Sequence, residues 1–338
     1  MRRRPGPSVA PGDHRGRYRL HVRHRGGALA RCQGTDLTAY RGRFAPSPTG
    51  PLHLGLARTA LVAWLRARSQ GGAFLLRSED IDGPRVVSSS LAQIMASMRF
   101  LGLDWDEGPD VGGPHAPYEQ SLRYDRYRAA LDTLQRAGRI YGCKCTRKEL
   151  AIASAPHGEF GPVYPGTCRQ NGLADDLARR FVVEDELPGF VDGLLGEVPA
   201  SAQGDFIVQR ADGTVSYQLA VVVDDIAMGI TEVVRGADLA GCTGWQLSLY
   251  RALGAEPPAF VHAPLLLGED GKRLAKRDRA IAVDELRERG VSAERIIGAI
   301  AASLGLGDGR ELEARALIPS FELARIDERP FDFASIDA

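Results

Sequence analysis

The chain beyond residue 40 first alternates short apolar runs with one amphipathic stretch. Residues 41–45, RGRFA, predict a short strand, and residues 73–77, AFLLR, predict another. Between them, residues 54–69 place apolar side chains at helical spacing before two glycines. Strand, helix and strand in this order form the βαβ unit of a parallel sheet, whose ligands lie beyond the carboxyl ends of the strands. The pattern therefore predicts an α/β fold.

The rest of the chain divides into further helices, strands and one irregular region. Residues 141–199 lose regular alternation and hold three cysteines, which indicates an inserted subdomain. Residues 215–225 are almost wholly apolar and predict a strand buried on both faces of the resumed sheet. The remaining predictions are helices over 91–101, 118–138, 244–254, 282–290 and 292–306, strands over 230–239 and 260–267, an exposed basic loop over 268–278, and a closing helix with an extended tail over 310–333.

Charge separates the first 40 residues from the rest. The whole chain balances 43 Lys and Arg against 43 Asp and Glu, yet residues 1–40 carry nine arginines and only Asp13 and Asp36 as acids. We expect this leader to be disordered. It fits a transit peptide, a nucleic-acid-binding arm or a start codon assigned too early, and we favour the third. No apolar run approaches the roughly 20 residues of a membrane span, so we expect a soluble cytoplasmic protein without a membrane partner.

Two separate segments are suited to binding phosphate. Residues 46–59, PSPTGPLHLGLART, form a Pro- and Gly-rich turn before an apolar helix, with His53 in its middle. Such a turn presents backbone N–H groups at a helix N-terminus. The second segment, GKRLAKRD, carries Lys272, Arg273, Lys276 and Arg277, which could stabilise charge that develops on a phosphate. Either segment alone is more often a structural turn or a solvated loop, so the pair carries the interpretation.

Together these segments resemble the two signatures of the class I aminoacyl-tRNA synthetases. HLGL, His53–Leu56, resembles "HIGH", and RLAKR, Arg273–Arg277, resembles "KMSKS". RFAPSPTGPLHLG, RSEDIDGPR and VVRGADL resemble the glutamyl branch. The signatures depart from the family at Leu56 and Ala275, which leaves His53 and Lys276 as the implied catalytic residues. The hydroxyl missing at Ala275 removes one hydrogen-bond donor, so we expect a slower activation step.

The resemblance implies a Rossmann-like parallel-sheet catalytic domain in two halves. The first half is 41–140 and the second 201–277. A zinc-binding subdomain, 141–200, is inserted between them, and a small helical segment, 278–338, follows.

Glutamate recognition requires an acid for the ammonium group and cations for the carboxylates, where guanidinium groups pair best. Glu79 suits the first role, and Arg43 and Arg235 suit the second. The resemblance implies ATP binding by His53, Gly55 and Lys276. Asp80, Asp82, Asp224 and Asp225 could order the site or meet a magnesium ion, and we leave them unassigned. The resemblance implies that glutamate is bound by Arg43, Phe44, Ala45, Pro46, Ser47, Glu79, Tyr217 and Arg235.

The cysteines indicate a metal site. The odd number, five, argues against a disulfide framework, and Cys143, Cys145 and Cys168 lie close together in sequence. Thiolates favour tetrahedral zinc, and residue chemistry alone nominates His157 as the fourth ligand. The resemblance instead implies Tyr164, and we follow it with His157 as the alternative. We expect one structural Zn²⁺.

The number of residues after the second signature helps to distinguish between two kinds of glutamyl enzyme. Only 62 residues follow Lys276 (338 − 276), so we expect no separate anticodon-binding domain. The chain therefore resembles the short glutamyl-synthetase paralogues that modify queuosine. This resemblance implies activation of L-glutamate with ATP and Mg²⁺, followed by transfer to queuosine in the anticodon loop of tRNA(Asp). The alternative is a truncated glutamyl-tRNA synthetase that charges the 3′ end of tRNA(Glu).

Overall fold

The structure, a computed structural model, describes residues 39–81, 83–146, 157–158, 161–170, 172, 177–184, 186–201, 204–265, 281–327 and 336. All of them belong to one compact unit, Thr38–Ala338, and the other unit, Met1–Leu37, lies outside the described residues. So do Asp82 and the basic loop with Lys272, Arg273, Lys276 and Arg277. Tyr40, the last residue of the expected leader, belongs to the fold, since its carbonyl oxygen accepts from Ala73 N–H at 2.9 Å.

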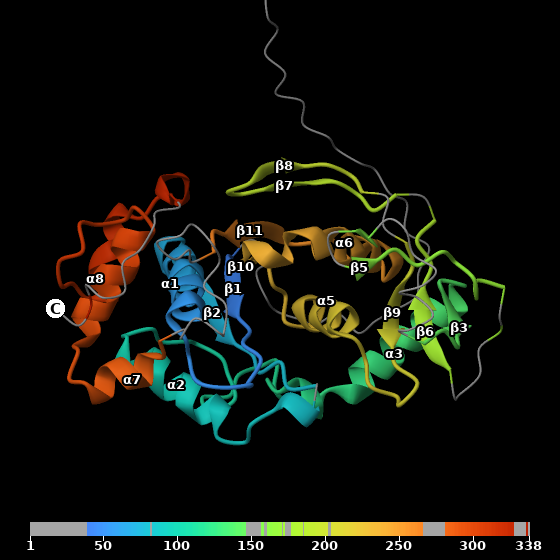
Figure 1. The fold of residues 1–338 in the computed structure, drawn as a ribbon, viewed down its shortest axis with the longest axis horizontal. Helices are drawn as coiled ribbons and strands as arrows, with labels where there is room; N and C mark the ends of the chain where they lie inside the picture. The colour runs from blue at the N-terminus through green and yellow to red at the C-terminus, as the bar shows by residue number, and fades with distance from the viewer. Residues whose placement is uncertain are drawn as a thin grey trace, which may run out of the picture. The chain divides into compact units, whose positions relative to one another are not determined.

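The centre of the fold is a parallel sheet, as the sequence predicts. β1 (Arg41–Phe44) pairs in parallel with β2 (Ala73–Leu76), and β10 (Glu232–Gly236) pairs in parallel with β11 (Ala259–Ala263). Thr231 N–H donates to the Arg41 carbonyl oxygen at 3.0 Å, so β1 and β10 lie side by side (Figure 1). This arrangement confirms the α/β fold with a parallel sheet.

Helices cover the sheet and enclose a large core. α1 (Leu54–Ser69) lies against β1 and buries Leu61 and Trp64 completely. The burial of such side chains is worth about 1.5–3 kcal/mol each. The same core includes side chains from α2 (Ser90–Phe100), α7 (Val283–Glu288) and α8 (Ala293–Ser303), which lie on the α1 side of the sheet in Figure 1.

The segment predicted as a doubly buried strand over 215–225 is instead a helix, α5 (Tyr217–Ala227). The Ser216 side chain caps it by accepting from Leu219 N–H at 3.4 Å. Every residue from Leu219 to Asp225 is buried, because α5 packs against α3 (Tyr124–Arg136) and α6 (Thr243–Ala252). A helix that is buried nearly all round has no polar face, so its sequence looks like that of a buried strand.

The cysteine-rich region contributes strands to three sheets. β6 (Ala178–Phe181) lies between β3 (Ile140–Cys143) and β9 (Phe206–Gln209) in an antiparallel sheet. β9 follows residue 200, the expected end of the subdomain, yet it completes this sheet. β7 (Phe190–Asp192) and β8 (Gly196–Val198) form a hairpin, and β7 extends the central sheet by pairing in parallel with β11 (Figure 1). A short hairpin joins β4 (His157–Gly158) to β5 (Gly161–Pro162).

Two predicted helices differ from the structure. The helix predicted over 118–138 is only α3, which a 3₁₀ turn precedes. A closing helix with an extended tail is expected over 310–333, but the described residues up to Asp327 form two 3₁₀ turns. The longer turn contains Pro319, a residue that an α-helix interior excludes. The 3₁₀ turns are η1 (Gly83–Arg85), η2 (Gln120–Leu122), η3 (Ala237–Cys242), η4 (Ala314–Ser320) and η5 (Leu323–Arg325).

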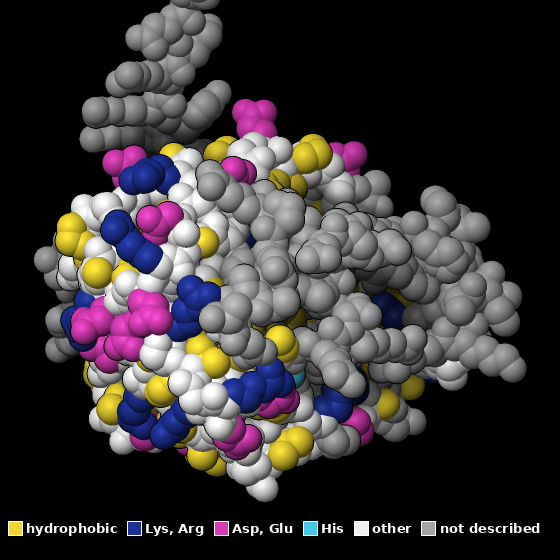
Figure 2. Space-filling view, turned by 60° about the vertical axis from the view of Figure 1, so that its left-hand side comes forward, with side chains coloured by type: hydrophobic (Ala, Val, Ile, Leu, Met, Phe, Trp, Pro, Cys, Tyr) yellow, Lys and Arg dark blue, Asp and Glu magenta, His cyan; other side chains and the backbone are white. Residues whose placement is uncertain are grey.

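The described surface is mixed in charge. On the face shown in Figure 2, acidic and basic side chains are interspersed over the described part. Among the described residues, no helix is both long and apolar enough to cross a membrane.

Candidate active site

One pocket of about 860 Å³ opens at the carboxyl ends of β1 and β10, where a parallel sheet binds its ligands. The structure brings together there every predicted glutamate or nucleotide residue that it describes. Lys276 is outside the described residues. The predicted residues that line the pocket are Arg43, Phe44, Ala45, Pro46, Ser47, His53, Gly55, Glu79, Tyr217 and Arg235.

The Pro- and Gly-rich turn places the N-terminus of α1 in this pocket. His53 is the residue before the helix, and His53, Leu54 and Gly55 all line the pocket. Leu54 N–H donates to the Ile281 carbonyl oxygen at 3.1 Å, which connects the start of α1 to the segment that follows the basic loop. The positive end of the helix dipole therefore faces the space where a phosphate could lie.

Described residues on both sides of the basic loop line the same pocket. Pro264 and Leu265 before the loop line the pocket, and so does Ile281 after it. An antiparallel bridge joins His53 to Ala282. The described residues that flank the basic loop therefore lie at the pocket that the first signature lines.

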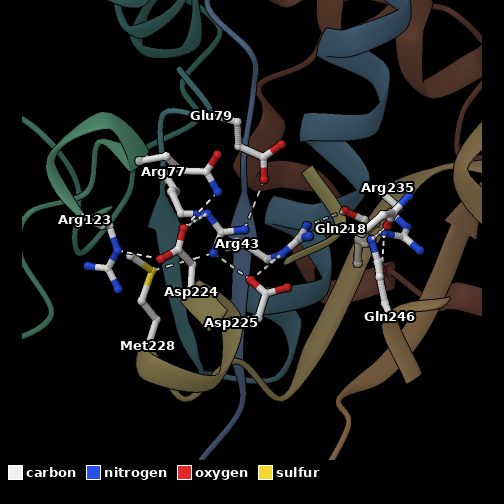
Figure 3. Close-up of polar contacts among 12 residues, drawn as sticks. Arg43, Arg77, Glu79, Arg123, Gln218, Asp224, Asp225, Met228, Arg235 and Gln246 are labelled. Atoms are coloured by element: carbon white, nitrogen blue, oxygen red, sulfur yellow. Dashed lines mark hydrogen bonds and ion pairs between the residues drawn. The ribbon is translucent and has the colours of Figure 1, made fainter. Parts of the chain in front are cut away.

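A buried ion network connects two residues that line the pocket, Arg43 and Glu79, through Arg77 and Asp225 (Figure 3). Asp225 Oδ1 lies 2.6 Å from Arg77 Nη1 and 3.3 Å from Arg43 Nε. Arg77 Nη2 in turn lies 3.2 Å from Glu79 Oε1. Asp225 on α5 thus joins Arg43, which belongs to β1, to Arg77, which directly follows β2, and Arg77 in turn contacts Glu79.

The charges of this network set the protonation of its members. Burial opposes the charged form of Asp225, but Arg43 and Arg77 outweigh it and hold the pKa of that carboxyl below its ordinary value. Burial raises the pKa of Glu79 even though Arg77 and Arg43 oppose the shift. Burial, and then the charge of Glu79, raise the pKa of Tyr217 to about 12. Tyr217 therefore stays neutral at the pocket wall.

The neighbouring aspartates have structural partners. Asp224 accepts from Arg123 Nε at 2.6 Å and from the Tyr127 hydroxyl at 2.8 Å. Asp80 holds η2, because its carboxylate accepts from both the backbone N–H and the hydroxyl of Ser121. Asp80, Asp224 and Asp225 thus all have protein partners in the structure, and Asp82 lies outside the described residues.

Arg235 is fixed by a second group of buried hydrogen-bond partners, which the sequence did not reveal. Its Nη1 donates to Gln246 Oε1 at 2.7 Å (Figure 3), its Nη2 to Thr243 Oγ1 at 2.8 Å and its Nε to His262 Nε2 at 3.0 Å. His262 Nδ1 lies 2.6 Å from Asp192 Oδ2. In the sequence, His262 belongs to a predicted strand and Asp192 to the irregular region. Neither is part of a motif, so no local signal identifies them.

Three thiols and one phenol gather near β3. The Sγ atoms of Cys143, Cys145 and Cys168 all lie within 4.8 Å of one another and could hold a metal ion. The Tyr164 hydroxyl oxygen lies 3.6 Å from Cys143 Sγ and 3.7 Å from Cys145 Sγ. Burial opposes the thiolate of Cys168, but hydrogen bonds led by that from Tyr164 lower its pKa to about 7. His157 belongs to β4, and its side chain is outside the described part of the structure.

Comparison with known proteins agrees with this architecture. Residues 39–326 match the family described as tRNA synthetases class I (E and Q), catalytic domain. The chain is 54% identical over 304 residues to the glutamyl-Q tRNA(Asp) synthetase of Symbiobacterium thermophilum, covering 86% of this chain and 94% of that protein. It is 42% identical to glutamate–tRNA ligase 2 of Syntrophus aciditrophicus, covering 85% of this chain and 62% of that one.

A solved structure shares the fold. The glutamate–tRNA synthetase of Elizabethkingia anophelis superimposes with a TM-score of 0.75 at 29% identity, covering 88% of this chain and 69% of that one. The central parallel sheet has a helix N-terminus at its carboxyl edge, and residues 39–326 match the family model. The chain therefore belongs to the class I tRNA synthetases of the glutamyl and glutaminyl type, a family of aminoacyl-tRNA ligases.

Proposed function

We propose that this protein activates L-glutamate with ATP and transfers the glutamyl group to queuosine in the anticodon loop of tRNA(Asp). The observation that carries the proposal is the single pocket that joins Glu79, Arg43 and Arg235 to the N-terminus of α1. A pocket for an amino acid thus adjoins a place for a phosphate. This adjacency is what adenylate formation requires.

Three charged residues of the pocket have a role in the first step of the proposed reaction. Glu79 binds the ammonium group, and the guanidinium groups of Arg43 and Arg235 bind carboxylate oxygens. The pocket-lining Phe44, Ala45, Pro46, Ser47 and Tyr217 complete the glutamate site. The substrate carboxylate then attacks the α-phosphorus of ATP, which releases pyrophosphate.

Positioning and electrostatics would provide the catalysis. His53 and Gly55, at the start of α1, would meet the triphosphate, and Lys276 on the basic loop would stabilise its developing charge. A Mg²⁺ ion bound with ATP would neutralise part of the triphosphate charge. No residue needs to form a covalent bond to the substrate.

The acceptor follows from the relatives. The relative with 54% identity, nearly all of whose length this chain spans, is named for queuosine-containing tRNA(Asp), whereas the cited glutamate–tRNA ligase is 42% identical. In this proposal the anticodon loop itself enters the catalytic pocket. The acceptor hydroxyl of queuosine would then attack the glutamyl-adenylate and release AMP.

We also propose that the cysteine cluster binds one structural Zn²⁺ through Cys143, Cys145, Tyr164 and Cys168. Tetrahedral zinc with Zn–S bonds of about 2.3 Å separates its sulfur ligands by about 3.8 Å. The Cys145 and Cys168 Sγ atoms are 3.5 Å apart, and Tyr164 lies at similar distances from two of the sulfurs. The donor set therefore fits zinc, which would fix β3 to the loop that carries Cys168.

The acceptor is tested with labelled glutamate and ATP. The protein is incubated with queuosine-containing tRNA(Asp), with tRNA(Asp) that carries guanosine at the same position, or with tRNA(Glu). Label on the first RNA alone supports the proposal. Label on tRNA(Glu) would instead make the protein a minimal glutamyl-tRNA synthetase, and Glu79→Gln serves as the inactive control.

A further inference from the structure

We propose that Asp192 and His262 are positioning residues for Arg235, so that the β7–β8 hairpin helps to select the substrate carboxylate. The inference rests on the proposed function in one respect, since it takes Arg235 as a ligand of glutamate. It adds to that function a dependence on two residues that lie outside both signature segments.

The hydrogen bonds define one protonation state for this pair. Arg235 Nε–H donates to His262 Nε2 at 3.0 Å, and a guanidinium group has no acceptor to offer. His262 Nε2 must therefore be unprotonated, and the ring proton must be on Nδ1, from which it is donated to Asp192 Oδ2 at 2.6 Å. The Asp192 carboxylate thus selects the tautomer that can accept from Arg235.

Burial makes this chain of contacts rigid. Arg235 is 5% exposed, Asp192 3% and His262 0%. Burial lowers the pKa of His262, and Arg235 and Arg43 add to that effect, while Asp192 opposes it. The imidazole is therefore neutral near pH 7, which the acceptor role at Nε2 requires.

The hairpin also fixes the orientation of the ring. Phe260 stacks on His262 with an interplanar angle of 6°, and the Phe190 ring centroid lies 5.9 Å from that of His262. Asp192 Oδ1 accepts from Leu194 N–H at 2.9 Å and from Leu195 N–H at 3.0 Å, so the turn of the hairpin holds the carboxylate. β7 therefore supplies both a packing surface and a hydrogen-bond partner for His262.

Arg235 depends on His262 at one particular nitrogen. Gln246 and Thr243 accept from Nη1 and Nη2, whereas the single Nε–H donates to His262. Loss of that acceptor would leave a buried donor without a partner and favour rotation of the guanidinium group. Rotation would misplace the nitrogens that face the pocket, and substrate affinity would fall.

Four variants separate positioning from folding. In Asp192→Asn the amide oxygen can still accept from the hairpin N–H groups, but the amide NH₂ faces His262 Nδ1 and moves the ring proton to Nε2. His262→Gln can accept from Arg235 with its oxygen and donate to Asp192 with its NH₂, whereas His262→Leu can do neither. Val191→Asn is the matched control, because Val191 is on the same strand and 74% exposed.

Glutamate-dependent exchange of labelled pyrophosphate into ATP reports the effect. We expect Asp192→Asn and His262→Leu to raise the KM for glutamate about tenfold to a hundredfold. The KM for ATP should stay within about twofold of wild type, and His262→Gln should restore the glutamate KM to within about threefold. Val191→Asn should match the wild type. A wild-type glutamate KM in folded Asp192→Asn, or a His262→Gln variant no better than His262→Leu, overturns the inference.

A spectroscopic measurement separates failure of this inference from failure of the proposed function. If the wild type shows no exchange with glutamate, the proposed activation step is wrong, and the ring tautomer still tests the pair. In ¹⁵N NMR spectra near pH 7, His262 should carry its proton on Nδ1 in the wild type and on Nε2 in Asp192→Asn. A charged ring, or an Nε2 proton in the wild type, contradicts the inference.

Discussion

Asp225 on α5 lies between two arginines, with Oδ1 2.6 Å from Arg77 Nη1 and 3.3 Å from Arg43 Nε. Arg77 and Asp225 are no more than 3% exposed, so the attraction between them is little screened. Through Arg77 the contact extends to Glu79, 3.2 Å away. Arg77, which contacts the expected ammonium ligand, is thus held by a residue of α5 that lies 148 positions further along the chain.

We expect Asp225→Ala to destabilise the protein by about 3–5 kcal/mol, because it leaves two buried guanidinium groups without this counter-charge. Urea unfolding followed by circular dichroism measures the change. Asp308→Ala is the control, since its ion pair with Arg310 is largely exposed and should have little effect. Equal midpoints for the two variants would contradict the role of Asp225.

Glutamate affinity should fall as the pH is lowered from 7 toward 5. Burial raises the pKa of Glu79 above its ordinary 4.5, so the carboxylate that binds ammonium is lost at a higher pH than an exposed glutamate would be. The same raised pKa affects the stability of the fold in the opposite direction, because it favours folding at low pH. A raised carboxyl pKa contributes stability below the unfolded pKa, and this contribution is lost as the pH rises through the folded value.

Isothermal titration calorimetry of glutamate across this pH range tests the expectation. The His262 imidazole beside Arg235 could also gain a proton as the pH falls. His262→Gln removes that imidazole and keeps Glu79, so it separates the titration of Glu79 from that of His262. Glutamate binding that is independent of pH in His262→Gln would show that Glu79 does not control the affinity.

Tyr164→Phe should reduce the zinc content of the purified protein, whereas His157→Ala should not. The Tyr164 hydroxyl lies within 3.7 Å of two cysteine sulfurs and accepts from Cys168 N–H at 2.9 Å, so it is part of the cluster. Metal content is measured by inductively coupled plasma mass spectrometry after dialysis against a weak chelator. Zinc loss confined to His157→Ala would reverse the assignment of the fourth ligand.

Leu61→Ala should lower the free energy of unfolding by about 2–5 kcal/mol, because it opens a cavity under α1 in the fully buried core. Leu122→Ala is a matched control, since Leu122 is 66% exposed. The KM for glutamate should be unchanged in both variants, as neither side chain lines the pocket. Thermal unfolding and the pyrophosphate exchange assay check the two parts of this prediction.

Local features, which depend on neighbouring residues, could be predicted from the sequence. The βαβ unit over residues 41–77 follows from hydrophobic periodicity and from two glycines, and it is present as predicted. The turn at residues 46–59 is defined by Pro and Gly, whose backbone restrictions act within a few residues. Resemblance of motifs supplied the glutamate residues, and those that the structure describes share one pocket.

Features that depend on contacts between distant segments could be found only in the folded chain. The apolar run at 217–227 is a helix because it is surrounded by α3 and α6, and hydrophobicity without a polar face does not distinguish a helix from a strand. Asp192 and His262 are 70 residues apart and belong to no motif. Their burial together beside Arg235 results from the pairing of β7 with β11, a long-range contact that no local sequence pattern records.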